Sequence, residues 1–320
     1  MINTVAVVSG GSPDYLIDIV ADGMIRLLGH ENVYIKYAWS RPGAAEDTKF
    51  SFLYAATKDH QNQIALADCQ ALVVSVRVPE KYIEEYRRTT FGGTVAILDG
   101  EDTGELKEEH LRIGDLYFKR EYFRNGKYPV KLVDVPRVRR FSPVYYKRYP
   151  KKVANLSLGV VPSSYGVSDV NVQKTGGAFF AGNVTSKIRQ QLKEMMTASG
   201  YTYLTNILTM EEYIKDVRRH WICVAPRGAG WDTYRYWEIP YLSSVLLCQN
   251  HPLKFDDDFV HGKSCLRFST VAEARSVIDG YLRRKDELSR IADEGQRLVM
   301  ERHLSVHRAA KVLEALRSLK

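Results

Sequence analysis

Short apolar runs alternate with amphipathic stretches along most of the chain, and this alternation limits the fold more than any other feature. The opening run TVAVVSGG (4–11) is rich in β-branched residues and ends in glycines. The stretch that follows, YLIDIVADGMIRLLG (15–29), has apolar residues at helical spacing and Gly29 as a C-cap. Because strands separated by helices form parallel sheets covered by helices on both faces, the pattern predicts an α/β fold.

The same pattern occurs twice along the 320 residues, which suits two domains better than one core. A polar, glycine-rich stretch (162–177) separates the two halves. We expect an N-terminal Rossmann-like domain over 1–165 and a C-terminal one over 166–320 that includes a helical tail. The predicted strands lie near 4–9, 32–39, 69–79, 93–102, 178–183, 202–208, 221–226 and 245–250. Helices lie between them near 15–29, 62–70, 81–91, 185–200, 210–220 and 232–244.

Composition excludes several classes of protein. Hydrophobic residues make up 45% and charged residues 26% of the chain, as in globular enzymes. No apolar run reaches the ~18–20 residues that span a bilayer, and no basic region precedes the first apolar run as in a signal peptide. The four cysteines show no CxxC spacing, which argues against a zinc site and a disulfide framework. These features predict a cytoplasmic protein, with peripheral attachment to a membrane as an option.

The positive charge is concentrated in one segment, 117–152, which we call the basic segment. Between 119 and 152 it holds twelve Lys and Arg against two acids, a net charge of +10 in a chain whose total is +8. Tyrosine and phenylalanine are interspersed with these cations. Three interpretations stay open: a surface for an anionic glycan or lipid-linked acceptor, a nucleic-acid groove, or a scaffold whose cations are solvated.

A second segment, PRGAGWDTYRYWE (226–238), lies where a predicted strand ends and a helix begins. Ligands of open α/β sheets bind beyond the carboxyl ends of the strands. Asp232 or Thr233 can cap the helix, whose free N–H groups favour an anion. Arg227 and Arg235 carry guanidinium groups that match phosphate oxygens, and Glu238 can accept hydrogen bonds from a ribose diol. The spacing therefore predicts a nucleotide or nucleotide-sugar site.

A structural interpretation of these residues competes with the functional one. Arg235 and Glu238 are three residues apart, so they can form a solvated ion pair on the helix surface. Trp237 can fill core. Spacing alone leaves both interpretations open.

The segment resembles the donor site of exostosin-like glycosyltransferases, which carry an Arg-Gly-x-Gly-x-Asp-Thr/Ser-x-Arg-x-x-Glu run. The C-terminal half is also similar to the CgeB-like, spore-maturation-type glycosyltransferases. That second resemblance is carried by AFFAGNVTSKIRQQL (178–192), FVHGKSCLRFSTVAEARSVIDGYL (259–282) and RIADEGQRLVMERHLSVHRA (290–309), with VAILDGED (95–102) and LYFKREYF (116–123) in the first half. It implies a GT-B fold, in which two Rossmann-like domains face a cleft.

The resemblance also implies roles for individual residues. Glu238 would hold the ribose of a nucleoside-diphosphate-sugar donor, and Arg227 and Arg235 its diphosphate. Gly182, Asn183 and Thr185 would lie near the phosphates, with Lys187 and Arg189 as weaker candidates. GT-B enzymes usually need no metal, so we expect neither a metal nor a cofactor.

This sequence departs from the family pattern at three places. Gly230 stands where many retaining members have a second glutamate. Ser243-Ser244 replaces a glycine, and Pro240 interrupts the helix.

Candidate acceptor-side residues lie in the first half. Asp99, Glu101 and Asp102 end a predicted strand, where a carboxylate can act as the base that deprotonates an acceptor hydroxyl; the alternative is a solvated turn. The loop SGGSPD (9–14) lacks the GxGxxG pattern of a dinucleotide site and is either a plain turn or an acceptor-side loop. The acceptor-side candidates are Gly10, Gly11, Asp14, Lys119 and Arg120.

These patterns predict a metal-independent GT-B glycosyltransferase that moves a sugar from a nucleoside-diphosphate-sugar donor to a hydroxyl of a glycan, lipid-linked or protein acceptor. Two alternatives remain. One is a DNA-modifying glycosyltransferase, or another nucleic-acid binder, that uses the basic segment. The other is a module that binds nucleotide-sugars without catalysis.

Overall fold

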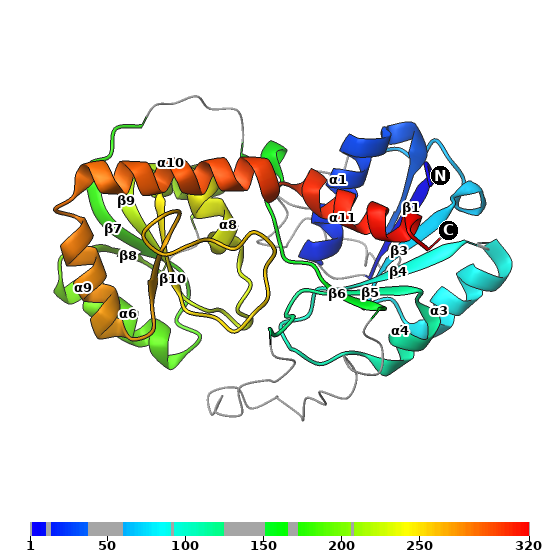
Figure 1. The fold of residues 1–320 in the computed structure, drawn as a ribbon, viewed down its shortest axis with the longest axis horizontal. Helices are drawn as coiled ribbons and strands as arrows, with labels where there is room; N and C mark the ends of the chain where they lie inside the picture. Colours follow the sequence, from blue (N-terminus) through cyan, green and yellow to red (C-terminus); the bar gives the residue numbers. More distant parts are fainter. Residues whose placement is uncertain are drawn as a thin grey trace. The chain divides into compact units, whose positions relative to one another are not determined.

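In a computed structural model, the strands and helices of the chain form two units, each built on a parallel sheet (Figure 1). The structure describes residues 2–10, 14–37, 60–90, 93–124, 151–165, 172–205 and 208–319. Unit 1 holds the described residues from 2 to 124, with 151–164 and 304–319. Unit 2 holds residue 165 and the described residues from 172 to 303. Two parallel-sheet α/β domains confirm the predicted fold class.

The sheet of unit 1 has the strand order β2-β1-β3-β4-β5-β6, with every described pair parallel. Because the order reverses direction between β1 and β3, this sheet has a topological switch point there. Its strands are β1 (Val5–Ser9), β2 (Val33–Tyr37), β3 (Ala71–Ser75), β4 (Thr94–Asp99), β5 (Leu116–Lys119) and β6 (Val153–Asn155). Its helices are α1 (Tyr15–Leu28), α3 (Glu80–Glu85), α4 (Glu108–Ile113) and α11 (Ser305–Arg317), with short turns η1 (His30–Asn32), η2 (Leu66–Asp68) and η3 (Tyr86–Thr90). The turn η4 (Pro162–Tyr165) begins in unit 1, and its last residue belongs to unit 2.

The sheet of unit 2 has the order β11-β10-β9-β7-β8, and its pairs are again parallel. Its switch point lies between β7 and β9. The strands are β7 (Gly176–Ala181), β8 (Thr202–Leu204), β9 (His220–Ala225), β10 (Val245–Gln249) and β11 (Leu266–Phe268). The helices are α6 (Lys187–Ala198), α7 (Met210–Arg219), α8 (Tyr234–Tyr241), α9 (Val271–Tyr281) and α10 (Lys285–Arg302). Helices α6 and α9 lie side by side (Figure 1), and apolar residues of both helices join the core of this sheet.

Local sequence accounts for the ends of several helices. Asp14 caps α1 by accepting a hydrogen bond from the Ile17 amide, and Gly29 ends the helix at a φ of 86°, as predicted. Helix α8 ends one residue after Pro240. Ser243 follows with a φ of 60°, a left-handed conformation that glycine adopts most easily. The backbone therefore keeps a glycine-like turn at the place where the sequence departs from the family pattern.

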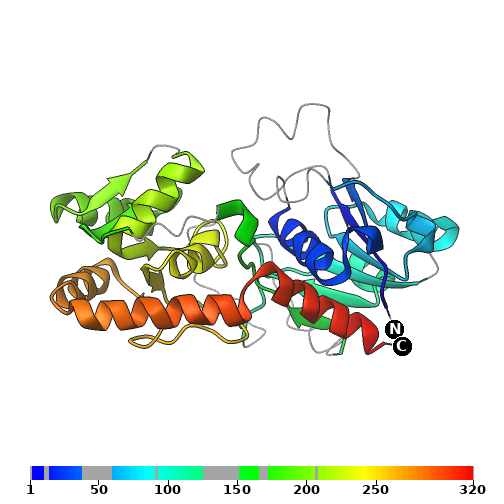
Figure 2. The same ribbon diagram turned by 90° about the horizontal axis from the view of Figure 1, so that it is seen from above.

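The last helix does not belong to the domain in which the prediction placed it, the C-terminal domain over 166–320. Helix α11 belongs to unit 1 and lies beside α1 (Figures 1 and 2). The Ser305 hydroxyl donates a hydrogen bond to Asp22, and Arg308 Nε donates to the carbonyls of Ser157 and Leu158. Tail periodicity predicts the helix but carries no information about the domain on which it packs.

The close contact of α1 with α11 yields a prediction at Gly23. A β-carbon there would lie 2.2 Å from the Ser305 carbonyl oxygen and 2.7 Å from Ala309 Cβ. We expect Gly23→Ala to lower the free energy of unfolding by about 1–3 kcal/mol, because the helices must separate. Gly280→Ala in α9 is the matched control, since its added β-carbon would lie 3.9 Å from Arg284 Nη2, its nearest neighbour. Helix propensity should make that control up to about 1 kcal/mol more stable. Urea denaturation measures both changes, and equal stability of the two variants would contradict the packing.

Candidate functional site

The loops after β7 and β9 form the candidate site in unit 2. Gly182 and Asn183 follow β7, and Pro226 and Arg227 follow β9. These two strands are neighbours on either side of the switch point, where the crevice of an open α/β sheet accommodates ligands. The site predicted from PRGAGWDTYRYWE and the phosphate-side residues predicted after β7 therefore lie at the same edge of one sheet.

Arg189 of α6 joins these two loops. Its Nε donates to the Arg227 carbonyl at 2.8 Å, Nη1 donates to the Asn183 carbonyl at 3.1 Å, and Nη2 donates to the Pro226 carbonyl at 3.4 Å. Its side chain is buried, with 6% of the residue exposed. The family resemblance made Arg189 only a weaker candidate, but the structure gives it a central position between the loops.

The guanidinium groups of Arg189 and Arg235 meet at this site without a salt bridge to an acid of a described residue, and Arg227 lies in the adjoining loop after β9. A β-carbon on Gly182 would lie 3.3 Å from Arg189 Nη1 and 3.7 Å from Arg235 Nη2. Within the described chain, none of these guanidinium groups forms an ion pair with a carboxylate; Arg227 stacks over Trp231 and Arg235 over Tyr213. Burial, together with the charge of Arg235, lowers the pKa of Arg189 to about 10. Buried cations are normally paired, so this cluster is suited to an anionic ligand.

Helix α6 begins beside the arginines and carries a further polar group that sequence reasoning missed. The Ser186 hydroxyl is buried at the N-cap position and has no hydrogen-bond partner among the described residues. Asn183 and Thr185, predicted to lie near the phosphates, are exposed in the preceding loop, and Lys187 is exposed at the first position of the helix. A hydroxyl and helix N–H groups next to guanidinium groups are typical of phosphate sites.

Glu238, the predicted ribose ligand, is buried with 4% exposure. Its Oε1 accepts a hydrogen bond from the Tyr165 hydroxyl at 2.6 Å, and its Oε2 accepts one from the Tyr213 hydroxyl at 3.1 Å. Burial raises the pKa of Glu238, while the Tyr165 hydrogen bond and the charge of Arg235 oppose that rise. The solvated ion pair between Glu238 and Arg235, which spacing left open, does not form because the carboxylate is turned to the tyrosines.

Asp232 and Thr233 have structural positions at the start of α8. Asp232 is 1% exposed and accepts a hydrogen bond from Trp237 Nε1 at 2.8 Å. Thr233 is the N-cap residue, but its side chain makes no capping hydrogen bond. Trp237 fills core, as the structural interpretation expected, so only part of the motif is directed to a ligand.

The candidate bases of unit 1 are all held in ion pairs. Asp99 is 1% exposed and accepts hydrogen bonds from Lys119 Nζ at 2.8 Å and from the Tyr117 hydroxyl. Glu101 accepts from Arg77 Nε at 2.7 Å. Asp102 pairs with Arg120. The alternative of a solvated turn is therefore wrong for Asp99, and each carboxylate already has a cation beside it.

Two predicted acceptor-side cations are also buried. Lys119 is fully buried and Arg120 is 5% exposed, because both turn inward to the acids after β4. Neither side chain is placed to meet an acceptor at the surface, which corrects that prediction. Residues 125–150, and with them most of the basic segment, lie outside the described residues.

The loop after β1 brings further polar groups to the switch point of unit 1. Asp14 caps α1, accepts a hydrogen bond from the Ser75 hydroxyl, and lies 4.0 Å from Arg77 Nε. Gly10 allows a close approach, since a β-carbon there would lie 2.7 Å from Arg77 Cβ. Burial raises the pKa of Asp14. Gly11 lies outside the described residues, so its predicted role stays a prediction.

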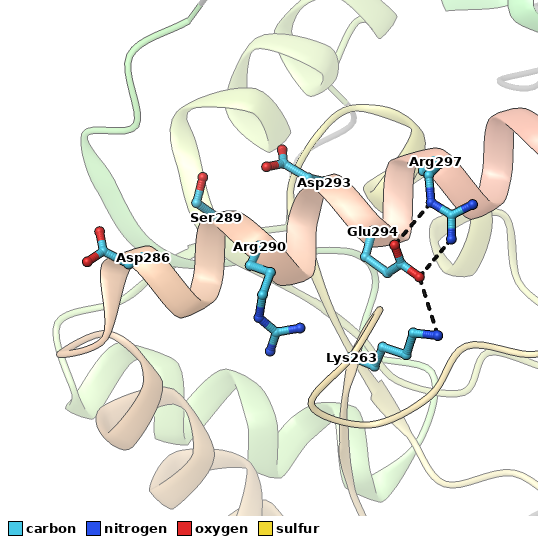
Figure 3. Close-up of a pocket in the computed structure, with 7 residues that line it drawn as sticks. All are labelled: Lys263, Asp286, Ser289, Arg290, Asp293, Glu294 and Arg297. Carbon is cyan, nitrogen blue, oxygen red and sulfur yellow. Dashed lines mark hydrogen bonds and ion pairs between the residues drawn. The ribbon is translucent and has the colours of Figure 1, made fainter.

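A separate cavity of about 640 Å³ lies along α10 (Figure 3). Its lining residues carry charges of both signs that neutralise one another; Glu294, for example, contacts both Lys263 and Arg297. None of the lining residues belongs to the loops after β7 and β9, so the cavity is not the candidate donor site. Across the described ranges, no group of three or more His, Cys, Asp or Glu side chains is arranged to hold a metal ion. The described helices include none long and apolar enough to cross a membrane.

Comparison with known proteins agrees with this architecture. Residues 217–314, about a third of the chain, match the model of a family described as glycosyl transferase-like, and this range includes Arg227, Arg235 and Glu238. No curated protein sequence matches the chain significantly.

Solved structures show the fold over nearly the whole length. HepE from Anabaena in complex with UDP is similar with a TM-score of 0.60 and 8% identity, over 98% of this chain and 100% of that one. Sucrose-phosphate synthase from Thermosynechococcus elongatus has a TM-score of 0.57 and 8% identity, over 99% of each chain. An α-glucosyltransferase in complex with UDP and a 13-mer DNA containing a HMU base has a TM-score of 0.61 and 10% identity, over 98% of this chain and 99% of that one. The fold is that of GT-B glycosyltransferases, as predicted.

Proposed function

We propose that this chain is a GT-B glycosyltransferase whose unit 2 binds a nucleoside-diphosphate-sugar donor. The observation that carries the proposal is the pair of guanidinium groups of Arg189 and Arg235 at the β7/β9 switch point, with Arg227 in the loop after β9. None of the three forms an ion pair with a carboxylate of a described residue. A diphosphate supplies the missing negative charge, and Glu238 on the same helix as Arg235 supplies a ligand for ribose. The match of 217–314 to a glycosyl transferase-like family supports this assignment.

In the proposed reaction, the bond between the anomeric carbon and the diphosphate breaks while a hydroxyl oxygen of the acceptor bonds to that carbon. The hydroxyl proton passes to the departing diphosphate or to solvent. Negative charge grows on the departing diphosphate, so cations positioned beforehand stabilise the transition state more than the bound donor. We assign this role to Arg227 and Arg235. Arg189 orients the two loops from which the site is built.

For the acceptor, we propose a class and no single molecule: a glycan, a lipid-linked molecule or a protein that offers a hydroxyl. The resemblance of the sequence to CgeB-like and exostosin-like enzymes supports it. The DNA-modifying alternative draws less support from the described residues, because Lys119 and Arg120 are buried against acids and do not add to a surface for polyanions.

The first test is a thermal-shift panel of UDP, GDP, CDP, dTDP and ADP, with their common sugars, on the wild type and on Glu238→Ala. A nucleotide at ~100 times its Kd should stabilise the fold by ~2.7 kcal/mol, which raises Tm measurably. We expect one nucleotide class to do so, and Glu238→Ala to abolish the shift. Glu211→Ala, which removes an exposed glutamate of α7, is the control and should respond like the wild type.

Two further outcomes separate the alternatives. A wild type that folds well but is stabilised by no nucleotide would contradict the proposed donor site. Stabilisation by a nucleotide-sugar without sugar transfer or donor hydrolysis would identify a binding module in place of an enzyme.

A further inference from the structure

The two hydrogen bonds that Glu238 accepts have the pattern of a bound diol. One hydroxyl donates to each carboxylate oxygen, from Tyr165 at 2.6 Å and from Tyr213 at 3.1 Å. A ribose 2′,3′-diol also presents two neighbouring O–H donors to the two oxygens of one carboxylate. In the protein without nucleotide, the phenols therefore satisfy the carboxylate in the way that a ribose would.

The two tyrosines are held differently. Tyr213 lies inside the ten-residue helix α7, and the Arg235 guanidinium lies 5.9 Å from its ring centroid, so one side chain contacts both predicted donor ligands of α8. Tyr165 is the last residue of the four-residue turn η4, whose 3-10 geometry gives weaker backbone hydrogen bonds than an α-helix. Its ring packs against Tyr241, with 5.4 Å between centroids. Tyr165 is thus the partner that can leave Glu238 with the smaller change of backbone.

Burial makes such an exchange necessary. Glu238 is 4% exposed and Tyr165 is 3% exposed, so a sugar hydroxyl reaches the carboxylate only after a group that covers it moves away. A buried carboxylate must also keep its hydrogen bonds, because an unsatisfied one is strongly unfavourable. A ligand that brings a hydroxyl donor of its own meets both conditions.

We propose that the Tyr165 hydroxyl occupies the position of a ribose hydroxyl in the free protein, and that a ribonucleoside-diphosphate donor replaces it with its 2′,3′-diol. This inference rests on the proposed function and narrows its substrate class. A 2′-deoxyribonucleotide can displace the Tyr165 hydroxyl, but its sugar donates one hydrogen bond to Glu238 where a ribose donates two. The site therefore selects UDP-, GDP-, CDP- or ADP-sugars over dTDP-sugars.

The test compares Tyr165→Phe with the wild type, by calorimetric titration with the nucleoside diphosphate that stabilises the wild type most and with its 2′,3′-dideoxy analogue. Removal of the competing hydroxyl should tighten binding of the ribonucleotide about tenfold, the value of one hydrogen bond to a charged group. Binding of the dideoxy analogue should not change, since it does not engage Glu238 through a diol. The wild type should bind the ribonucleotide about tenfold more tightly than its 2′-deoxy form.

Two variants serve as controls. Tyr213→Phe should weaken ribonucleotide binding, because Tyr213 stays in place and contacts both Glu238 and Arg235. Tyr201→Phe removes a phenol that also donates to a carboxylate, that of Asp279, but outside the site, and it should bind like the wild type.

Several outcomes would overturn the proposal while leaving the donor site intact. One is weaker ribonucleotide binding by Tyr165→Phe, as by Tyr213→Phe, which would make Tyr165 a permanent support of Glu238. Another is an equal gain for the dideoxy analogue, and a third is a preference of the wild type for dTDP. If the wild type binds no nucleotide at all, the proposed function itself fails.

Discussion

Replacement of Arg189 by methionine is expected to weaken the binding of a nucleoside diphosphate about 100-fold. The guanidinium bonds to carbonyls of both loops at the β7/β9 switch point, and its positive charge lies close to that of Arg235 without an ion pair to a described carboxylate. Hydrogen bonds to charged groups contribute about 1.5–3 kcal/mol each, so the loss of this charge and of the loop geometry together accounts for such a factor. Titration with UDP, GDP, CDP and ADP measures it.

A comparison of ligands with and without phosphate distinguishes a loss of phosphate binding from a general loss of structure in the Arg189 variants. The Arg189→Met variant should bind the free nucleoside nearly as well as the wild type does, because the nucleoside lacks the anion. Arg189→Lys keeps the charge but cannot donate to three carbonyls. Its affinity for the nucleoside diphosphate should therefore lie between that of the wild type and that of Arg189→Met. Arg275→Met removes an exposed arginine of α9 and serves as the matched control.

The structure also predicts how the Arg189 variants behave without ligand. Methionine leaves the carbonyls of Arg227, Asn183 and Pro226 without this donor, which should lower the free energy of unfolding by about 1–3 kcal/mol. Urea denaturation gives this value separately. Equal losses of affinity for the nucleoside and the nucleoside diphosphate would show that Arg189 supports the fold and not a phosphate site.

Asp99→Ala is expected to destabilise unit 1 by about 3–5 kcal/mol. The carboxylate is 1% exposed and pairs with Lys119, which is fully buried, so alanine leaves an ammonium group uncompensated in the core. Glu84→Ala in α3 is the control from the same unit. Both side chains of its ion pair with Arg88 are exposed, so its removal should change stability by about 1 kcal/mol or less.

A double variant completes this test. Asp99→Leu combined with Lys119→Met removes both charges, and it should recover most of the stability that Asp99→Ala loses. Thermal and urea unfolding measure all three variants. If Asp99→Ala instead folds with the stability of the wild type and loses only sugar transfer, Asp99 is the catalytic base that its position at the end of a strand first predicted.

Much of the fold could be predicted from the sequence because its signals are local. Helix α1 is defined by apolar residues at helical spacing, Asp14 before them and Gly29 after them. The predicted strands, which correspond to β1–β4 and β7–β10, are apolar runs that end in loops. The expected helix near 62–70 is only the short turn η2 (Leu66–Asp68), since its few apolar residues lack a continuous helical face. The short strands β5, β6 and β11 went unpredicted because three or four residues carry little pattern of their own. The three-residue β8 was found only because it lies within a longer apolar run.

The candidate site was only partly predictable. Arg227, Arg235 and Glu238 lie within twelve residues of one another, so a single motif identifies them. Their partners come from elsewhere: Tyr165 is 73 residues from Glu238, Tyr213 is 25 residues from it, and Arg189 is 38 residues from Arg227. No local pattern marks these partners, because tyrosines and arginines are common on any helix or turn.

The sequence by itself determined the α/β architecture and the strand-end motif, because hydrophobic period, helix caps and turn residues act over a few positions. Only the tertiary structure decided what each charged group faces. Asp99 and Lys119 are both polar at the end of a strand, yet they neutralise each other in the core of unit 1. Arg189 and Arg235 meet without an ion pair to a carboxylate of any described residue. The physical reason is that the energy of a charge depends on its burial and its partners, and both are set by contacts between residues far apart in the chain.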